Sequence, residues 1–260
     1  MKILAGLLLI VVIPAFGQKK IKTIELSDSI KSAYVDRVGE LYVITRGGQV
    51  QRYDADGKLQ ILYRADDIPT LFDPRDGARL FAYYRSTQTY QYLNPSFEIT
   101  KAYRIDSSFA IEPWLICPSG DHKLWVLDAV DHSLKRLNPK ESVVEVEVVI
   151  DSVLIRDARL FTTMREYQGF VFLFEPGKGI HIFSAMGKHI KTIAAPGSTS
   201  FHFLGEEMYY RDGSSIRFLD LFSAEGRAIQ PVQKSGDILL TDIRLFHVQD
   251  LRVDIYEYTP

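Results

Sequence analysis

Short segments with the same order of apolar and polar residues recur along the chain. Each begins with an apolar residue, has a polar residue second and an aliphatic or aromatic residue fourth, and ends in a polar residue. The segments are Val50–Asp54, Tyr90–Asn94, Leu134–Asn138, Ile180–Ser184, Ile216–Asp220 and Val253–Glu257. Their last residues are 40, 44, 46, 36 and 37 positions apart. This spacing indicates one structural unit that is repeated six times.

A second apolar strand precedes each of these segments, and turns rich in Gly, Asp and Asn lie around both. Strands at short, regular spacing indicate an all-β fold, and no segment shows a sustained helical period. In the third unit we expect four strands, at 114–118, 123–128, 133–138 and 142–149. Four strands in about 40 residues are typical of a propeller blade, so the repeat predicts a six-bladed β-propeller.

The strands of a blade should differ in pattern according to their place. The apolar run Phe170–Phe174 is uninterrupted, as expected for an inner strand that packs on both faces. Residues 144–148 alternate Val with Glu, as expected for an outermost strand that is half exposed.

The sixth unit has one strand fewer than the others, with strands expected at 238–241, 244–248 and 251–258. A spare strand is available at 21–26, and its Ile-Lys-Thr-Ile matches residues 190–193, the fourth strand of unit four. We therefore expect the N-terminal strand to complete the last blade. This closure would leave only short, protected sheet edges.

The first residues have the pattern of a targeting segment. Lys2 precedes the apolar run Ile3–Ile13, and Ala15 and Gly17 place small residues at −3 and −1 of a cleavage point before Gln18. The run is shorter than the roughly 20 apolar residues that span a bilayer. We therefore predict a cleaved signal peptide.

The resulting division is a signal peptide at 1–17 and a single propeller domain at 18–260. No second hydrophobic span follows the leader, so we expect no transmembrane segment in the mature chain. The expected location is outside the cytoplasm, in the periplasm, with any association with the outer membrane made through a partner.

The amino-acid composition and net charge of the chain argue against some classes of protein function. The chain is 46% hydrophobic and 25% charged, as in ordinary globular proteins. Its 31 basic and 33 acidic residues give a net charge of −2, which argues against a dedicated nucleic-acid binder. The one Cys excludes an internal disulfide and a zinc site with several thiolates.

The chain resembles secreted six-bladed propellers of the NHL and gluconolactonase-like kind. The matching residues are Asp36-x-x-Gly39-x-Leu41-Tyr42-Val43, then Val50–Asp54 and Gly57-Lys58. This pattern specifies a blade and not a ligand. A leader cut before Gln is also similar to those of Bacteroidota cell-envelope proteins.

The gluconolactonase resemblance implies a Ca²⁺ or Zn²⁺ ion in the axial channel, held by Glu, Asn and Asp side chains of several innermost strands. Hard oxygen ligands suit such cations. The oxygen candidates here are Asp36, Asp73, Glu112 and Asp242. No Asn falls on a first strand, which departs from the family, and turn capping is the alternative role for these acids. We therefore predict no cofactor and no metal.

The second unit has the most distinctive local composition. Tyr beside Arg is typical of protein or glycan contact surfaces, because it offers contact area together with hydrogen bonds. The alternative is packing of strands between blades. The candidate binding residues are Arg75, Arg79, Tyr83, Tyr84, Arg85, Tyr90 and Tyr92.

Nucleophilic catalysis has little support in the sequence. Cys117 lies in an apolar first strand, where Cys is usually a small hydrophobic residue. We expect His122 and His132 in turns and His181 and His189 at the surface, while His202 on a first strand could face the channel.

A complete propeller without a recognisable catalytic constellation leads to one main hypothesis. We expect a non-catalytic protein-binding or scaffold propeller whose partner is an envelope protein, as part of or accessory to an outer-membrane complex. The alternative is a metal-dependent lactonase or esterase-like hydrolase with its site at the channel.

Overall fold

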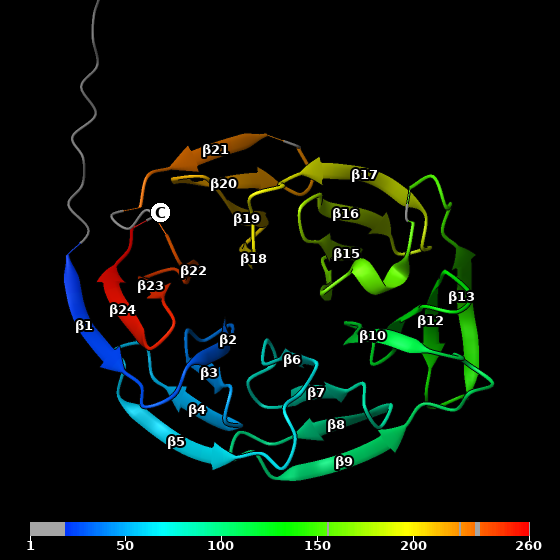
Figure 1. Cartoon of the computed structure of the whole chain (residues 1–260), viewed down its shortest axis with the longest axis horizontal. Helices are drawn as coiled ribbons and strands as arrows, with labels where there is room; N and C mark the ends of the chain where they lie inside the picture. The colour runs from blue at the N-terminus through cyan, green and yellow to red at the C-terminus, as the bar shows by residue number, and fades with distance from the viewer. Residues whose placement is uncertain (1–18, 155, 224, 232–234, 260) are drawn as a thin grey trace, which may run out of the picture.

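The computed structural model describes residues 19–154, 156–223, 225–231 and 235–259, so the predicted signal peptide lies outside the described residues. Six four-stranded antiparallel sheets stand around a central axis in this part of the chain, and the predicted six-bladed propeller is confirmed (Figure 1). The strands of each blade are given from the innermost to the outermost. Blade 1 consists of β2 (Ile30–Val35), β3 (Leu41–Thr45), β4 (Gln49–Tyr53) and β5 (Leu59–Arg64). Blade 2 consists of β6 (Leu71–Asp73), β7 (Leu80–Tyr84), β8 (Thr89–Leu93) and β9 (Ile99–Arg104). Blade 3 consists of β10 (Pro113–Pro118), β11 (Leu124–Asp128), β12 (Ser133–Asn138) and β13 (Val143–Val149). Blade 4 consists of β14 (Thr163–Tyr167), β15 (Phe170–Glu175), β16 (Gly179–Ser184) and β17 (His189–Ala194). Blade 5 consists of β18 (Phe201–Leu204), β19 (Glu207–Asp212), β20 (Ser215–Asp220) and β21 (Gly226–Ile229). Blade 6 consists of β22 (Asp237–Leu240), β23 (Arg244–Val248), β24 (Arg252–Glu257) and β1 (Lys20–Glu25).

Blade 6 is completed by the N-terminal strand, as predicted. β1 pairs antiparallel with β24, with Lys20 opposite Tyr256 and Glu25 opposite Arg252. Side chains reinforce the pairing, because Thr23 Oγ1 donates a 2.7 Å hydrogen bond to Asp254. The last blade therefore joins the two ends of the chain, and the ring is closed by backbone hydrogen bonds rather than by a covalent link.

Burial follows the place of each strand in its blade. The second strands β3 and β11 are buried along their whole length. The outermost strand β13 alternates as predicted, with Val146 buried and Glu145 and Glu147 exposed. β9 departs from this expectation, because all six of its residues are exposed.

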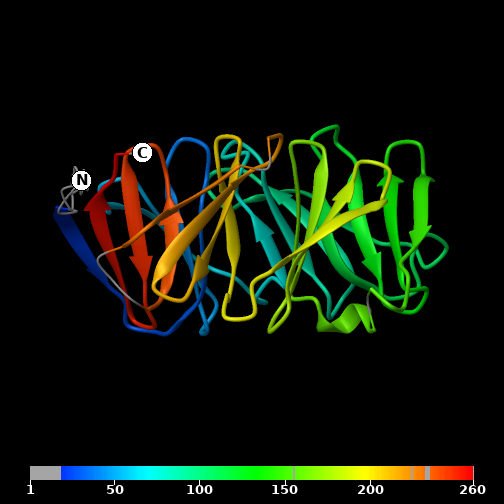
Figure 2. The ribbon, with the colours of Figure 1, turned by 90° about the horizontal axis from the view of Figure 1, so that it is seen from above.

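The ring has two faces that carry different connections. The segments that join successive blades, such as 65–70 and the described residues of 150–154 and 156–162, lie on one face together with the short 3₁₀ helix η1 (Ala158–Leu160). We call it the interblade face, and it is below in Figure 2. The opposite face, here the terminal face, carries the turns between first and second strands and the C-terminal end. Among the described residues, no helix is long and apolar enough to cross a membrane.

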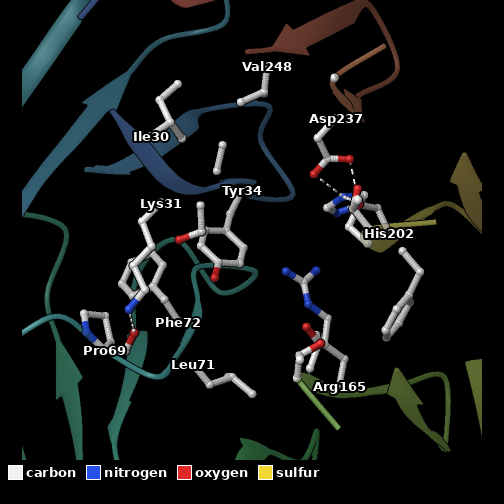
Figure 3. A pocket seen from close by; sticks show the side chains of 18 of the residues that line it. Ile30, Lys31, Tyr34, Pro69, Leu71, Phe72, Arg165, His202, Asp237 and Val248 are labelled. Atoms are coloured by element: carbon white, nitrogen blue, oxygen red, sulfur yellow. Dashed lines mark hydrogen bonds and ion pairs between the residues drawn. The ribbon is translucent and has the colours of Figure 1, made fainter. Parts of the chain in front are cut away.

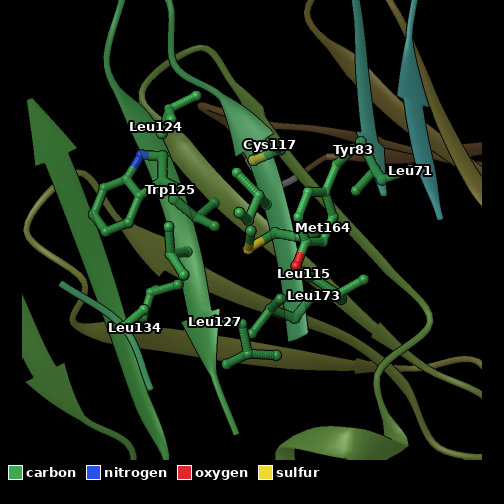
Figure 4. Close-up of a cluster of buried hydrophobic side chains, with 14 of the residues drawn as sticks. Leu71, Tyr83, Leu115, Cys117, Leu124, Trp125, Leu127, Leu134, Met164 and Leu173 are labelled. Atoms are coloured by element: carbon green, nitrogen blue, oxygen red, sulfur yellow. The ribbon is translucent and has the colours of Figure 1, made fainter. Parts of the chain in front are cut away.

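The core lies between neighbouring blades and not at the axis. Its largest cluster runs from blade 2 through blade 3 to blade 4 and includes Tyr83, Leu115, Trp125 and Leu173 (Figure 4). Each fully buried side chain of this size contributes about 1.5–3 kcal/mol, so the contacts between blades hold the ring together. The axis is left free for polar side chains and open space.

Candidate functional site

Two cavities lie on the axis and meet at the same two residues. One, of about 570 Å³, opens on the interblade face and is lined by the first residues of β2, β6, β14, β18 and β22. The other, of about 390 Å³, opens on the terminal face among the far ends of β2, β18 and β22. Arg165 and His202 line both cavities, so they lie at the waist between the two openings.

His202 faces the axis and is also held by partners. Its Nε2 lies 3.2 Å from Ser200 Oγ and 3.3 Å from Asp237 Oδ2, and Ser200 Oγ donates to Asp237 Oδ1 at 2.6 Å. Burial works against the charge of Asp237, but the neighbouring His202 outweighs it and lowers the pKa of this carboxyl. A catalytic triad requires the imidazole to bridge Ser and Asp through its two different nitrogens. Here both contacts use Nε2, so this trio is not arranged as a triad.

Two of the three predicted binding arginines, Arg75 and Arg79, lie on the terminal face and differ in their contacts and exposure. Arg75 Nε donates to both oxygens of Asp73, at 2.9 and 2.8 Å, and Nη1 donates to the carbonyl of Glu166 in blade 4. Arg79 is half exposed, pairs with Asp76 and lies 5.2 Å from the ring centre of Tyr92. Arg75 is therefore a structural link between blades 2 and 4, whereas Arg79 is accessible.

The predicted tyrosine surface is divided by the fold. Tyr83 is fully buried and donates to the carbonyl of Pro113 in blade 3, and Tyr90 is buried against neighbouring rings. These two tyrosines pack between strands and blades, so neither can touch a partner. Tyr84 and Arg85 lie at the interblade end of β7, away from Tyr92. The residues selected from blade 2 therefore do not form one surface.

Arg85 belongs to the contact between blades 2 and 3. Its Cζ lies 3.3 Å from the ring centre of Trp114, and its Nε donates to the Trp114 carbonyl at 2.8 Å. Trp114 in turn donates to the carbonyl of Phe161. A guanidinium stacked on an aromatic ring stabilises the packing of both groups.

The four acids considered for a channel metal are not brought together. Asp36 accepts hydrogen bonds from the N–H groups of Val38 and Glu40, which makes it a turn cap, and Asp73 is paired with Arg75. Glu112 lies on the interblade face and pairs with Arg159, whereas Asp242 lies at the terminal opening. Across the described ranges, no group of three or more His, Cys, Asp or Glu side chains has an arrangement that could hold a metal ion.

Cys117 and His181 are both interior residues. Cys117 is fully buried in the cluster of blades 2 to 4, and burial strongly raises the pKa of its thiol, so it is held as a neutral thiol. The expectation that His181 lies at the surface is wrong. It is fully buried in β16, where its nitrogens contact Glu175 and Thr192 and burial lowers its pKa. β16 is buried at five of its six residues, which the local sequence does not reveal.

Five large apolar side chains are exposed on the interblade face around blade 3, and we call them the blade 3 patch. They are Ile111 before β10, Val130 in the β11–β12 turn, Val149 at the end of β13, Val153 beyond it and Leu160 in η1. Val153 is 92% exposed, so its side chain makes almost no contact within the ring. Apolar side chains gathered on one face mark interaction sites more often than scattered ones do.

Hydrogen bonds hold the segments of this patch close together. The Asp128 carboxylate accepts the N–H groups of Ile111 at 2.8 Å and Val130 at 3.1 Å. Burial works against the charge of Asp128, but these backbone donors, the N–H of Glu112 and the Lys135 ammonium together outweigh it and lower the pKa of this carboxyl. The N–H of Ile150 donates to the His132 carbonyl, which fixes the segment after β13 beside the same turn.

The sequence analysis selected neither the blade 3 patch nor Arg165. The signal for Arg165 was a basic residue within the first strand of unit four, Thr163–Tyr167, where the other units carry mostly apolar or small residues. The signal for the patch was apolar residues inside turns, such as Val130 and Val153. Each of these two sequence features identifies a candidate site only when the arrangement of the blades in space is known.

Comparison with known proteins supports the fold and leaves the function open. No family model and no curated protein matches the sequence. Among solved structures, the chain is similar to the Cps50 (Swd1) β-propeller domain of Myceliophteria thermophila, with 11% identity, a TM-score of 0.59 and coverage of 94% of this chain and 100% of that one. It is also similar to streptogramin B lyase, with 11% identity, a TM-score of 0.54 and coverage of 88% and 78%.

A third similar structure is the extracellular domain of BT4673 from B. thetaiotaomicron, with 12% identity and a TM-score of 0.52; the match covers 89% of this chain and 33% of that one. At such identities the likeness concerns the fold alone. The chain is therefore a six-bladed β-propeller. Because one neighbour is named a lyase and another an extracellular domain, the shared fold does not select a function.

Proposed function

We propose that this propeller is a non-catalytic protein-binding scaffold outside the cytoplasm, which serves as a component or accessory of an envelope complex at the outer membrane. The observation that carries the proposal is the blade 3 patch. Its five apolar side chains are exposed on a rigid ring, although side chains of this kind would lower the free energy by being buried. The leader pattern of residues 1–17 supports export.

A partner that covers the blade 3 patch would gain apolar burial without ordering the scaffold. The segments beneath the patch are already held by Asp128 and by the pairing of Glu112 with Arg159. A rigid surface of this kind loses little conformational entropy when it binds. We therefore expect an envelope protein to present a complementary apolar surface to this face of blade 3.

The test is an affinity capture from the native envelope fraction with the mature protein as bait. The variant is the double substitution Val130→Asp and Val153→Asp, which places charge at two exposed positions of the patch. The matched control is Met186→Asp, because Met186 is an exposed apolar residue on the terminal face. We expect the wild type and the control to recover the same partner, and the double variant to recover at least about tenfold less.

Two results would overturn the proposal. One is that the double variant recovers the partner as well as the control does. The other is turnover of lactones or esters by purified protein that contains a stoichiometric divalent cation, since that result would support a hydrolase instead. Sequencing the N-terminus of the exported protein tests the predicted cleavage before Gln18 in the same preparation.

A further inference from the structure

One buried cation on the axis forms no ion pair. Arg165 in β14 is only 7% exposed, and none of the hydrogen bonds or ion pairs found among the described residues involves its guanidinium, although it lies close enough to Asp73 to help lower the pKa of that carboxyl. Its recorded contact is with the face of Tyr34, whose ring centre lies 5.3 Å from Cζ. Arg75, which also lines the axial space, is by contrast held by Asp73 and a backbone carbonyl.

The guanidinium of Arg165 borders the open space of both cavities, and its nitrogens are not among the buried polar atoms that lack a partner. The ring face of Tyr34 attracts the cation, but it offers no oxygen that could accept the N–H groups. Figure 3 shows the guanidinium pointing into the open space between Tyr34 and His202. A cation held in this way at a cavity wall has N–H donors available for an anionic ligand.

The walls of the cavity on the interblade face combine a second cation with apolar side chains. Lys31 lies at the mouth, where its ammonium donates to the Pro69 carbonyl at 3.2 Å (Figure 3). Phe72, Leu71 and Val248 contribute apolar surface around the space. A volume of about 570 Å³ is within the range of cavities that hold small molecules.

The two carboxylates that line this cavity, Asp237 and Asp250, make their contacts with groups other than Arg165. Asp237 accepts from Ser200 and from the N–H of Ile238 and contacts His202. Asp250 accepts a 3.3 Å hydrogen bond from Ser29. Neither carboxylate forms an ion pair with Arg165, so the positive charge of the guanidinium remains available at the centre of the cavity.

We infer that the axial cavity on the interblade face binds a small organic carboxylate with an apolar body, whose carboxylate pairs with Arg165. The planar guanidinium can donate two parallel hydrogen bonds to a carboxylate, which is the geometry it prefers. The apolar body would lie against Phe72, Leu71 and Val248 near the mouth. This site is distinct from the blade 3 patch, so either proposal can fail without the other.

Calorimetric titration of the mature protein tests the class of ligand. The probes are benzoate, benzamide as its uncharged counterpart, acetate as a carboxylate without an apolar body, and inorganic phosphate. We expect benzoate to bind with a Kd of about 1 mM or tighter and each of the other probes to bind at least about tenfold more weakly. Equal binding of benzamide or phosphate, or no benzoate binding up to about 10 mM, would overturn the inference.

The role of Arg165 is tested with Arg165→Gln against Arg104→Gln, since Arg104 is an exposed residue of the outer strand β9. Loss of a charge-assisted pair should weaken benzoate binding about 10- to 100-fold in the first variant and leave it unchanged in the second. Equal affinities in both variants would refute the site.

A stability measurement separates a ligand-binding arginine from a structural one. In the ligand-free protein, Arg165→Met replaces an unpaired buried charge with an apolar side chain of similar length. We expect the Tm to rise by about 2–4 °C, because each kcal/mol shifts the Tm of a chain this size by that amount. A fall in Tm would show that Arg165 stabilises the fold and would contradict the inference.

Discussion

Two arginines at the axis show how pairing decides what a buried charge does. Arg75 is fixed by the buried Asp73 in blade 2, and it also donates to the Glu166 carbonyl of blade 4. Burial works against the charge of Asp73, but Arg75, helped by the charge of Arg165, outweighs it and holds the pKa of this carboxyl below its usual range. Arg165 has no such partner, so we assign it to a ligand and assign Arg75 to the fold.

The difference can be tested at Arg75 itself. Arg75→Ala leaves Asp73 buried without its counter-charge, and removal of one partner of a buried pair costs about 3–5 kcal/mol. Arg79→Ala, in the same loop, removes partly exposed contacts with Asp76, His122 and the Tyr92 ring and should cost about 1 kcal/mol or less. Urea unfolding monitored by tryptophan fluorescence measures both. Equal losses in the two variants would show that Arg75 is not the link described here.

At the scale of the element, strands were predictable where the apolar pattern repeats, and side-chain roles were not. The strands of blade 3 lie within one residue of their expected ranges, because the alternation and turns of each hairpin are local. Tyr83 and His181 are buried by neighbouring strands and blades, which the local pattern does not show. The axial cavity is formed by five strands that are far apart in sequence, so the position of Arg165 at a cavity is apparent only in the closed ring.

The β4–β5 turn shows how one blade constrains its neighbour. Gly57 has a φ of +75°, and a Cβ there would lie 2.5 Å from Ile255 Cδ1 in blade 6 and 3.3 Å from Ile24 Cδ1 in the closing strand. The turn is also tied to that strand, because Lys22 donates to the Gly57 carbonyl at 2.7 Å. The residue must therefore both adopt positive φ and leave room for blade 6.

Gly57→Ala should cost more than positive φ alone explains. The conformational part is about 1–2 kcal/mol, and crowding against Ile255 adds about 1–3 kcal/mol. The matched control is Gly213→Ala, because Gly213 has a φ of +58° and no atom within 4 Å of the added Cβ. Chemical unfolding of both variants separates the cost of positive φ from the cost of crowding against Ile255. If Gly213→Ala is as destabilising as Gly57→Ala, a Cβ at position 57 does not crowd blade 6.

At the scale of the whole molecule, the ring depends on a non-covalent joint between residues far apart in the chain. Asp254 in β24 is 1% exposed at its side chain and receives Thr23 and Lys20 from β1, each at 2.7 Å. Burial works against the charge of Asp254, but these hydrogen bonds and the Lys20 charge outweigh it and lower the pKa of this carboxyl. Ile24 of the same strand is buried in the core between blades 6 and 1. The joint thus combines backbone pairing, a charge network and apolar burial.

Removal of residues 18–28 should destabilise the whole ring, because it exposes the edge of β24 and leaves Asp254 without Thr23 and Lys20. We expect the Tm to fall by at least about 6 °C, since the loss of several kcal/mol shifts the Tm of a chain this size by about 2–4 °C per kcal/mol. A truncated protein that melts like the wild type would show that the ring does not depend on this joint.

Asp254→Asn is a milder variant of the same joint, and it should lower the free energy of unfolding by about 1–3 kcal/mol at pH 7. Because the folded pKa of Asp254 lies below its unfolded value of about 3.9, the stabilisation by its charge is present above that pH and is lost as the pH falls through the folded pKa. The difference between wild type and Asp254→Asn, measured by thermal melting, should therefore disappear under strongly acidic conditions.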